Sequence, residues 1–260
     1  ILGVIPQDKQ LGLPERHLGL VQAGEIEGIE TFMEHAAKMV ERCCDVAQMA
    51  ALAQRHAMDG QAPACRIPPL GRRIAVARDE AFAFTYPHLI DGWRAEGAQI
   101  SWFSPLADEA PETEADAVFL PGGYPELHAG KLSNAGRFRE GMQAQAAAGA
   151  LIYGECGGYM TLGEALVDAS GESHAMLGLL PLTTSFASRK RHLGYRKVKG
   201  LAGPFAGVEL SAHEFHYSTV VHEGQAERLF DAVDAAGEIV GPAGLCRGNV
   251  SGSYMHMIDL

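Results

Sequence analysis

Four runs of apolar residues, separated by helical patterns, constrain the fold of this chain more than any other feature. The two helical patterns cover residues 86–96 and 134–148. Unbroken apolar runs, without polar alternation, are typical of strands covered on both faces of a parallel sheet. The sequence therefore predicts an α/β fold, a mostly parallel sheet with helices on both faces. The runs are RIAVAR (73–78), AQISWF (98–103), DAVFLPGG (116–123) and ALIYGEC (150–156).

A different pattern precedes these strands. Apolar residues recur at helical spacing from near Glu27 onward, which predicts one long helix. The Pro- and Gly-rich stretch 58–72 interrupts that pattern and is typical of a linker. We expect two parts, residues 1–70 and residues 71–260. The first residue is not Met and no signal-peptide pattern follows it, so we expect the chain to begin inside a longer polypeptide.

Composition excludes several functional classes. The net charge is -11 over 260 residues, with Lys and Arg mostly scattered, so we expect no nucleic-acid partner. No run of about 18 apolar residues is present, so we expect no membrane partner. The five cysteines form neither a disulfide framework nor a CxxC pair, which indicates a reducing cytoplasm and no metal site.

Cys156 lies at the predicted end of a strand, in the segment GALIYGECGGYM (149–160). The small neighbours Gly154, Gly157 and Gly158 permit a tight strand-to-helix turn. The N-terminus of the following helix favours a thiolate and offers N–H groups to a developing oxyanion. This pattern indicates a nucleophilic cysteine; the alternative is a small buried cysteine in a glycine-rich turn.

A second glycine turn, LPGGYPE (120–126), follows the preceding apolar run. Because the carboxyl ends of parallel strands share one edge of the sheet, we expect the two turns to meet. The N–H groups of Gly123 and Gly157 would then form an oxyanion hole. This turn lacks the Lys-Ser/Thr of a phosphate loop, which disfavours phosphate binding.

A nucleophilic cysteine needs a base, and two segments offer histidines. One is SGSYMHM (251–257), which contains His256; the other is SAHEFHYS, which contains His213, Glu214 and His216. HEFH is not the HExxH of zinc hydrolases, because its histidines are three residues apart. The alternative for each histidine is a hydrogen-bonded structural role.

Several motifs together resemble one enzyme family. The motif PERHLGL (14–20) resembles the end of that family's ATP-dependent synthetase domain. The family is cobyrinic acid a,c-diamide synthase, including its hydrogenobyrinic acid variant of aerobic cobalamin synthesis. The resemblance implies a class-I glutamine amidotransferase-like, flavodoxin-like domain over 71–260 and a partial α/β synthetase domain before it. The motifs that resemble the amidotransferase domain are LPGGYPELHAGKL, GECGGYMTLG, GYR, HEFHYS and SYMH.

The resemblance implies a two-part reaction. Glutamine would be hydrolysed through a Cys156 thioester with His256 as base, and the ammonia would pass to the synthetase domain. There ATP and Mg²⁺ would activate the a and c acetates of the corrinoid. This chain contains no GxxxxGK[ST] phosphate loop, so we expect no cofactor in it and assign ATP and Mg²⁺ to the full-length enzyme. The oligomeric state stays open, with a homodimer as one alternative.

The sequence departs from the class-I pattern at the third member of the triad. A Glu usually stands two residues beyond the histidine, but this position is Ile258, followed by Asp259. Either His256 works without a carboxylate, or another acid such as Glu214 orients it. Two rival functions follow, a cysteine hydrolase or peptidase of the same fold and a catalytically silent binding module.

Overall fold

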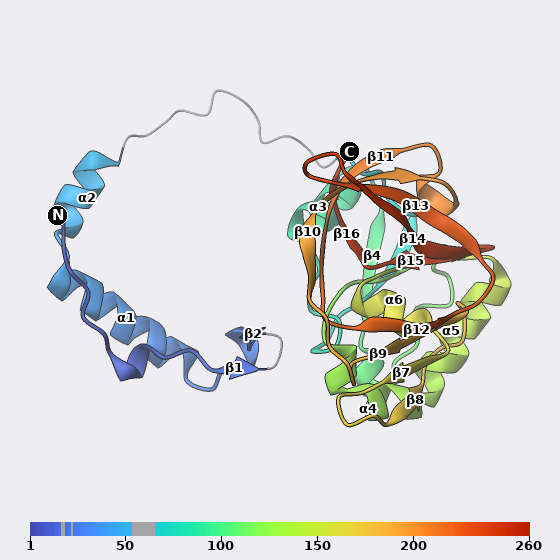
Figure 1. The fold of residues 1–260 in the computed structure, drawn as a ribbon, viewed down its shortest axis with the longest axis horizontal. Helices are drawn as coiled ribbons and strands as arrows, with labels where there is room; N and C mark the ends of the chain where they lie inside the picture. Colours follow the sequence, from blue (N-terminus) through green and yellow to red (C-terminus); the bar gives the residue numbers. More distant parts are fainter. Residues whose placement is uncertain (17–18, 22, 54–65) are drawn as a thin grey trace. The chain divides into compact units, whose positions relative to one another are not determined.

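The computed structural model describes residues 1–16, 19–21, 23–53 and 66–260 (Figure 1). The chain divides into two compact units, Ile1–Ala62 and Pro63–Leu260. The second unit begins a few residues before the predicted boundary near residue 70. Residues 58–65 of the predicted linker, Cys65 among them, lie outside the described residues.

The first unit is mainly helical. Its long helix α1 begins after Gly28, close to the predicted start near Glu27, and buries Met39. Asp45 caps the next helix, accepting a hydrogen bond from the backbone N–H of Gln48. The elements of this unit are η1 (Lys9–Leu11), β1 (Glu15–Arg16), β2 (Gly19–Leu20), η2 (Ala23–Glu25), α1 (Ile29–Cys43) and α2 (Val46–Leu52).

The second unit is built on a sheet with strand order β16-β11-β10-β13-β14-β15-β6-β5-β3-β4. From β15 to β4 every pairing is parallel. The four predicted runs form β3, β4, β5 and β6, which confirms the α/β class. The parallel strands are β3 (Arg73–Ala77), β4 (Gln99–Phe103), β5 (Ala117–Leu120), β6 (Leu151–Glu155) and β15 (Val250–Ser253).

The other half of this sheet is antiparallel, so the expected mostly parallel order holds only for the half just described. Buried and more exposed residues alternate along β11, as expected for a strand with one covered face. In Figure 1, β11, β13 and β14 lie at one end of the second unit. The antiparallel strands are β10 (His192–Gly200), β11 (Glu209–His216), β13 (Glu227–Asp234), β14 (Ile239–Arg247) and β16 (Met255–Asp259).

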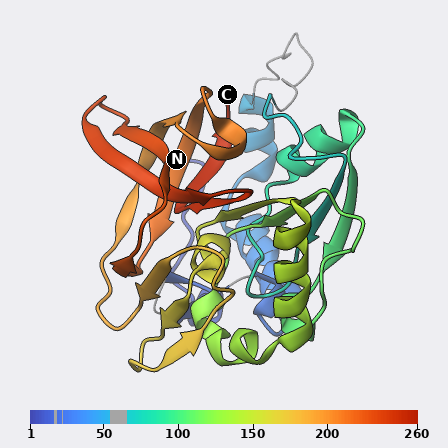
Figure 2. The same cartoon turned by 90° about the vertical axis from the view of Figure 1, so that its right-hand side faces the viewer.

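Helices cover both faces of the parallel strands, as predicted. Residues Leu89 and Trp93 of α3 join one core cluster, whereas Phe138 of α5 and Met160 of α6 join the other. Figure 2 shows the green helices beside the orange and red strands. The helical elements are α3 (Pro87–Ala95), η3 (Pro105–Ala107), η4 (Pro125–Leu127), α4 (Ala129–Asn134), α5 (Gly136–Ala148), α6 (Gly157–Leu162) and η5 (Gly203–Phe205).

A second, small sheet has the order β12-β9-β7-β8. It lies at the end of the unit away from β11, β13 and β14 (Figure 1). Within the described part of the chain, no helix has both the length and the apolar character needed to cross a bilayer. The strands of the small sheet are β7 (Ala165–Val167), β8 (Ser173–Ala175), β9 (Leu182–Ser185) and β12 (Thr219–Glu223).

Candidate active site

Cys156 occupies the turn between β6 and α6, as the sequence predicted. Its φ of 46° and ψ of -99° are strained for a residue with a side chain, a conformation that costs about 1–3 kcal/mol. Its backbone N–H donates to the carbonyl of Ser253 at 2.8 Å. The thiol is 5% exposed and donates to the carbonyl of Phe215 at 3.8 Å. The turn therefore holds Cys156 in one orientation, and burial raises the pKa of its thiol well above the usual range.

The two glycine turns meet beside Cys156. The N–H of Gly158 donates to the carbonyl of Pro121 at 3.1 Å, which ties the start of α6 to the end of β5. A Cβ on Gly157 would lie 2.9 Å from the backbone nitrogen of Gly123, closer than real side chains allow. The expected neighbourhood of Gly123 and Gly157 is therefore present, and only glycine fits at either position, since a Cβ on Gly123 would collide with the carbonyl of Ala81.

His256 comes to this region on β16. It lies opposite His213 in the β11–β16 ladder, and the two imidazoles stack with centroids 4.7 Å apart. His256 is 3% exposed, and burial, helped by two nearby histidines, lowers its pKa to about 3. Its ring lies against Gly122, where any Cβ would collide with Cε1. Three residues before it, Ser253 is the acceptor for Cys156, so one short segment both fixes the turn and carries the imidazole.

A buried carboxyl that the sequence analysis did not select lies beside this imidazole. Oε2 of Glu155 is 3.8 Å from Nδ1 of His256, and neither atom has a hydrogen-bond partner among the described residues. Its other oxygen accepts the N–H of Met257 at 3.1 Å. Glu155 is 1% exposed, and burial raises its pKa to about 8.

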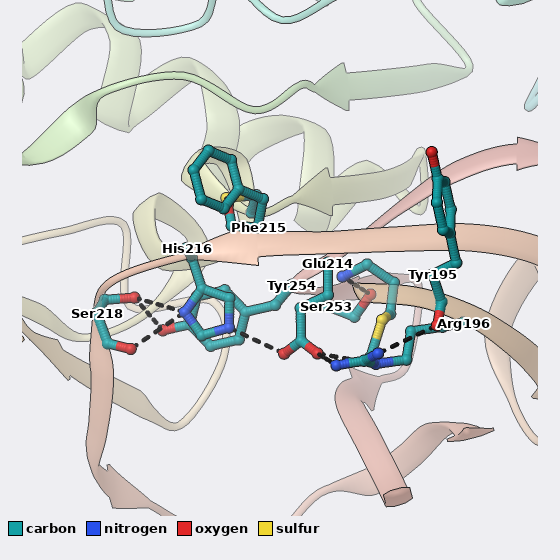
Figure 3. A network of polar contacts seen from close by, with 10 residues as sticks. Tyr195, Arg196, Glu214, Phe215, His216, Ser218, Ser253 and Tyr254 are labelled. Atoms are coloured by element: carbon teal, nitrogen blue, oxygen red, sulfur yellow. Dashed lines mark hydrogen bonds and ion pairs between the residues drawn. The ribbon is translucent and has the colours of Figure 1, made fainter. Parts of the chain in front are cut away.

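Glu214 faces a different network (Figure 3). Its Oε2 accepts from Arg196, with Nε at 3.1 Å and Nη2 at 2.8 Å, and its Oε1 pairs with Nε2 of His216 at 3.0 Å. The ring of His216 stacks on Tyr254 with centroids 3.6 Å apart. Side chains alternate along a strand, so Glu214 and His216 point away from the face on which His213 meets His256. The alternative in which Glu214 orients His256 does not fit this geometry.

The remaining residues of the region also have partners elsewhere. Asp259 forms an ion pair with Arg66, Oδ2 to Nη2 at 3.0 Å. Nε2 of His213 lies 2.5 Å from the hydroxyl of Tyr86, which fixes the ring that stacks on His256. The structure thus gathers Cys156, Gly123, Gly157, His213 and His256, and it places Glu214, His216 and Asp259 in other interactions.

A comparison with protein families matches residues 73–259 to the CobB/CobQ-like glutamine amidotransferase domain. The chain belongs to this family. Since the match begins at β3 and ends in β16, every element of the site just described lies within the amidotransferase domain. The family resemblance drawn from the sequence motifs is confirmed.

Curated relatives of the amidotransferase domain align over nearly the whole chain. Proteins named hydrogenobyrinate a,c-diamide synthase are 60% identical in Sinorhizobium sp, over all of this chain and 60% of that protein, and 57% identical in Brucella anthropi with the same coverage. The protein of that name from Rhodobacter capsulatus is 49% identical, over 99% of this chain and 59% of its own length. The chain therefore spans about 60% of the length of these relatives. A solved structure of PurLQS from Thermotoga maritima aligns over 71% of this chain and 86% of its own at 19% identity and a TM-score of 0.49, too remote for a functional inference.

Two groups of side chains in the amidotransferase domain have the composition of a metal site. They are His192 with Glu214 and His216, and Asp168 with Glu172 and His174. In the first, the carboxylate already pairs with the guanidinium of Arg196, whose charge opposes a cation. In the second, Oδ2 of Asp168 already pairs with Nε2 of His174 at 2.9 Å.

Proposed function

We propose that this amidotransferase domain hydrolyses glutamine to glutamate and ammonia, with Cys156 as nucleophile and His256 as base. One observation carries the proposal: the segment Ser253–His256 both accepts the N–H of the strained Cys156 and places a buried imidazole in the same region. A structural cysteine needs neither a strained backbone nor a histidine delivered beside its turn.

In the proposed reaction, His256 transfers each of the protons. The thiol proton of Cys156 passes to Nε2 of His256 as Sγ attacks the side-chain carboxamide carbon of glutamine. N–H groups of Gly123 and Gly157 stabilise the negative oxygen. His256 then gives the proton to the leaving ammonia and takes one from the water that attacks the thioester. As the C–S bond breaks, His256 returns that proton to Sγ of Cys156, and glutamate is released. Since burial raises the pKa of the thiol, the uncharged thiol prevails without substrate.

The wider reaction belongs to the full-length protein. We propose that the ammonia amidates the a and c acetates of cobyrinic or hydrogenobyrinic acid, with glutamine and the corrinoid as substrates. The names of relatives at up to 60% identity support this assignment. Because the 260 residues contain no phosphate loop, we assign ATP and Mg²⁺ to the portion of the relatives outside this chain.

We also propose a cytoplasmic location. The cysteines among the described residues, at positions 43, 44, 156 and 246, are all free. Free thiols persist where glutathione and thioredoxin keep them reduced. A thioester mechanism also requires that the thiol of Cys156 stays reduced.

Glutamate release from glutamine tests the glutaminase proposal. We expect the chain to release glutamate and Cys156→Ser to lose about 10³-fold or more of that rate, because a triad nucleophile has no substitute. A glutamine-mimicking alkylator should block the wild-type chain. Cys246→Ser is the matched control, since Cys246 is also buried and its thiol also donates to a carbonyl, that of Gly248 at 3.8 Å.

Other outcomes favour the rival functions. Cleavage of peptides or esters without glutamine would indicate a hydrolase of the same fold. If glutamate release is absent and Cys156 is alkylated at an ordinary thiol rate, the assay is repeated with the synthetase portion of a relative added. If glutamate release is still absent in that assay, the domain is a binding module. If glutamate is released, the domain is a glutaminase that the synthetase portion activates.

A further inference from the structure

The carboxyl of Glu155 and the imidazole of His256 form a pair that the rest of the structure leaves incomplete. Their facing atoms, Oε2 and Nδ1, are 3.8 Å apart, and both lack a hydrogen-bond partner among the described residues. The residues are 1% and 3% exposed, so water does not substitute freely for a partner. Buried polar atoms are rarely left unpaired, and an exception at a reaction centre calls for a functional explanation.

The two acids considered from the sequence are committed elsewhere. Glu214 pairs with Arg196 and His216 on the opposite face of β11, and Asp259 pairs with Arg66. Ile258 stands where the class-I pattern has a glutamate. Of these acids, Glu155 is the one whose carboxyl faces Nδ1 of His256, at 3.8 Å.

The attachment of Glu155 fixes which of its oxygens faces the imidazole. Oε1 accepts the backbone N–H of Met257, the residue that follows His256 on β16. This bond ties the carboxyl to the strand that carries the histidine, so the two move together. Hydrogen bonds between catalytic groups are often long without substrate and shorten in the complex.

We propose that Glu155 is the positioning residue for His256: its carboxylate accepts the Nδ1–H of the imidazole and so leaves Nε2 free to take the thiol proton of Cys156. This inference rests on the proposed glutaminase activity. In this proposal Glu155 takes the role of the glutamate that the class-I pattern has after the histidine, although it precedes the cysteine in sequence. A carboxylate so placed selects the reactive tautomer and stabilises the imidazolium that forms.

Protonation of Glu155 gives the pair a pH dependence. When the carboxyl carries its proton, it donates to Nδ1, which leaves the proton of the neutral imidazole on Nε2 and blocks its role as a base. Burial raises the pKa of Glu155 to about 8, so kcat should rise as the pH increases through about 8. The groups that face the carboxyl are His256, Tyr153, Tyr86 and Cys156.

Glu155→Gln is the decisive variant because it is isosteric and replaces one carboxyl oxygen by an NH₂ group. Its amide oxygen must face the N–H of Met257, so its NH₂ faces Nδ1 and forces the Nε2–H tautomer. We expect kcat to fall about 10⁴-fold, as for loss of an orienting carboxylate in a triad, and the rise of kcat near pH 8 to disappear. Glu155→Asp, which keeps the acid but shortens it, should recover part of the activity and the rise with pH.

The tautomer is measured directly by ¹⁵N NMR of histidine-labelled chain at pH 9, with His256 assigned by the signals missing from a His256→Asn variant. We expect Nδ1–H in the wild type and Nε2–H in Glu155→Gln. If the imidazole of the wild-type chain carries its proton on Nε2, the proposal is overturned, whether or not the Glu155 variants fold. A folded Glu155→Gln chain with wild-type kcat overturns it as well. If glutamate release is absent even with the synthetase portion of a relative added, while the tautomers are as expected, the glutaminase function is refuted and the placement of Glu155 stands.

Discussion

Gly122 determines how closely the imidazole of His256 can approach the turn after β5. A Cβ at this position would collide with Cε1 of the ring, and the ring is held on its other side by His213. The imidazole must therefore shift in a Gly122→Ala variant. Because a displacement of about 1 Å at a reacting group can cost about 100-fold in rate, we expect kcat for glutamate release to fall by about that factor.

Gly136→Ala is the matched control for this substitution. Gly136 begins α5, and a Cβ there meets no atom within 4 Å. Alanine in a helix is more stable than glycine by about 0.5–1 kcal/mol, so the control should keep its activity and gain slight stability. Equal kcat values for the two variants would show that His256 does not depend on Gly122 for its position.

At the scale of single residues, the sequence predicts those residues whose role depends only on their neighbours in sequence. Cys156 and its glycines are adjacent in sequence, so the turn chemistry identifies them without a fold. Glu155 is just as near in sequence, yet its significance depends on β15 and β16 passing beside β6, a contact across about a hundred positions. That contact is set by strand pairing, which no local pattern reveals.

The ladder between β10 and β11 contains a nearly buried ion pair. Arg196 and Glu214 have side chains 13% and 11% exposed, and His216, stacked on His192, also contacts the carboxylate. Burial alone would raise the pKa of Glu214, but the hydrogen bond from His216 and the charge of Arg196 outweigh it and hold the pKa below its ordinary value. The charged form is therefore favoured in the folded state.

Glu214→Gln tests this pair as a structural element. A lowered folded-state pKa contributes stability above the ordinary value of 4.5, and that contribution is lost as the pH falls toward the folded-state pKa. We expect the variant to lose about 2 kcal/mol in the free energy of unfolding at pH 7, as for a hydrogen bond to a charged group, and the difference from wild type to shrink as the pH falls below 4.5. Urea unfolding measures both.

Glu209→Gln on the same strand is the control, since Glu209 is exposed and its replacement should change stability by less than about 0.5 kcal/mol. If Glu214→Gln has the same free energy of unfolding as wild type at pH 7, the ion pair contributes nothing to stability. The tautomer of His256 should be the same in both variants.

At the scale of elements, the parallel half of the sheet is predictable and the antiparallel half is not. The strands β3, β5 and β6 are short, continuous apolar runs, because both of their faces are buried. In contrast, β14 contains Gly241, Pro242 and Gly244 and buries only Leu245 and Cys246, a composition that argues against a strand. Its pairing with β13 and β15 outweighs that local preference.

At the scale of the whole molecule, the hydrophobic core and the site residues both lie in the second unit. Both hydrophobic core clusters consist of residues from 67 onward, and every site residue lies in the same unit. The first unit buries Met39 in its long helix, but none of its described residues belongs to either cluster. We therefore expect the glutaminase chemistry to depend on the second unit, and the use of the ammonia to depend on parts that this chain does not supply.

An amidation assay tests this division of labour. The chain is incubated with glutamine, ATP, Mg²⁺ and hydrogenobyrinic acid, and glutamate, ADP and the mass of the corrinoid are followed together. Since the 260 residues contain no phosphate loop, no acyl phosphate can form, and we expect glutamate and free ammonia without ADP or a corrinoid amide. With ammonium chloride in place of glutamine we again expect neither ADP nor a corrinoid amide, because the missing step is carboxylate activation and not the supply of ammonia. Formation of ADP and amide that disappears in Cys156→Ser would instead place the synthetase chemistry within these residues.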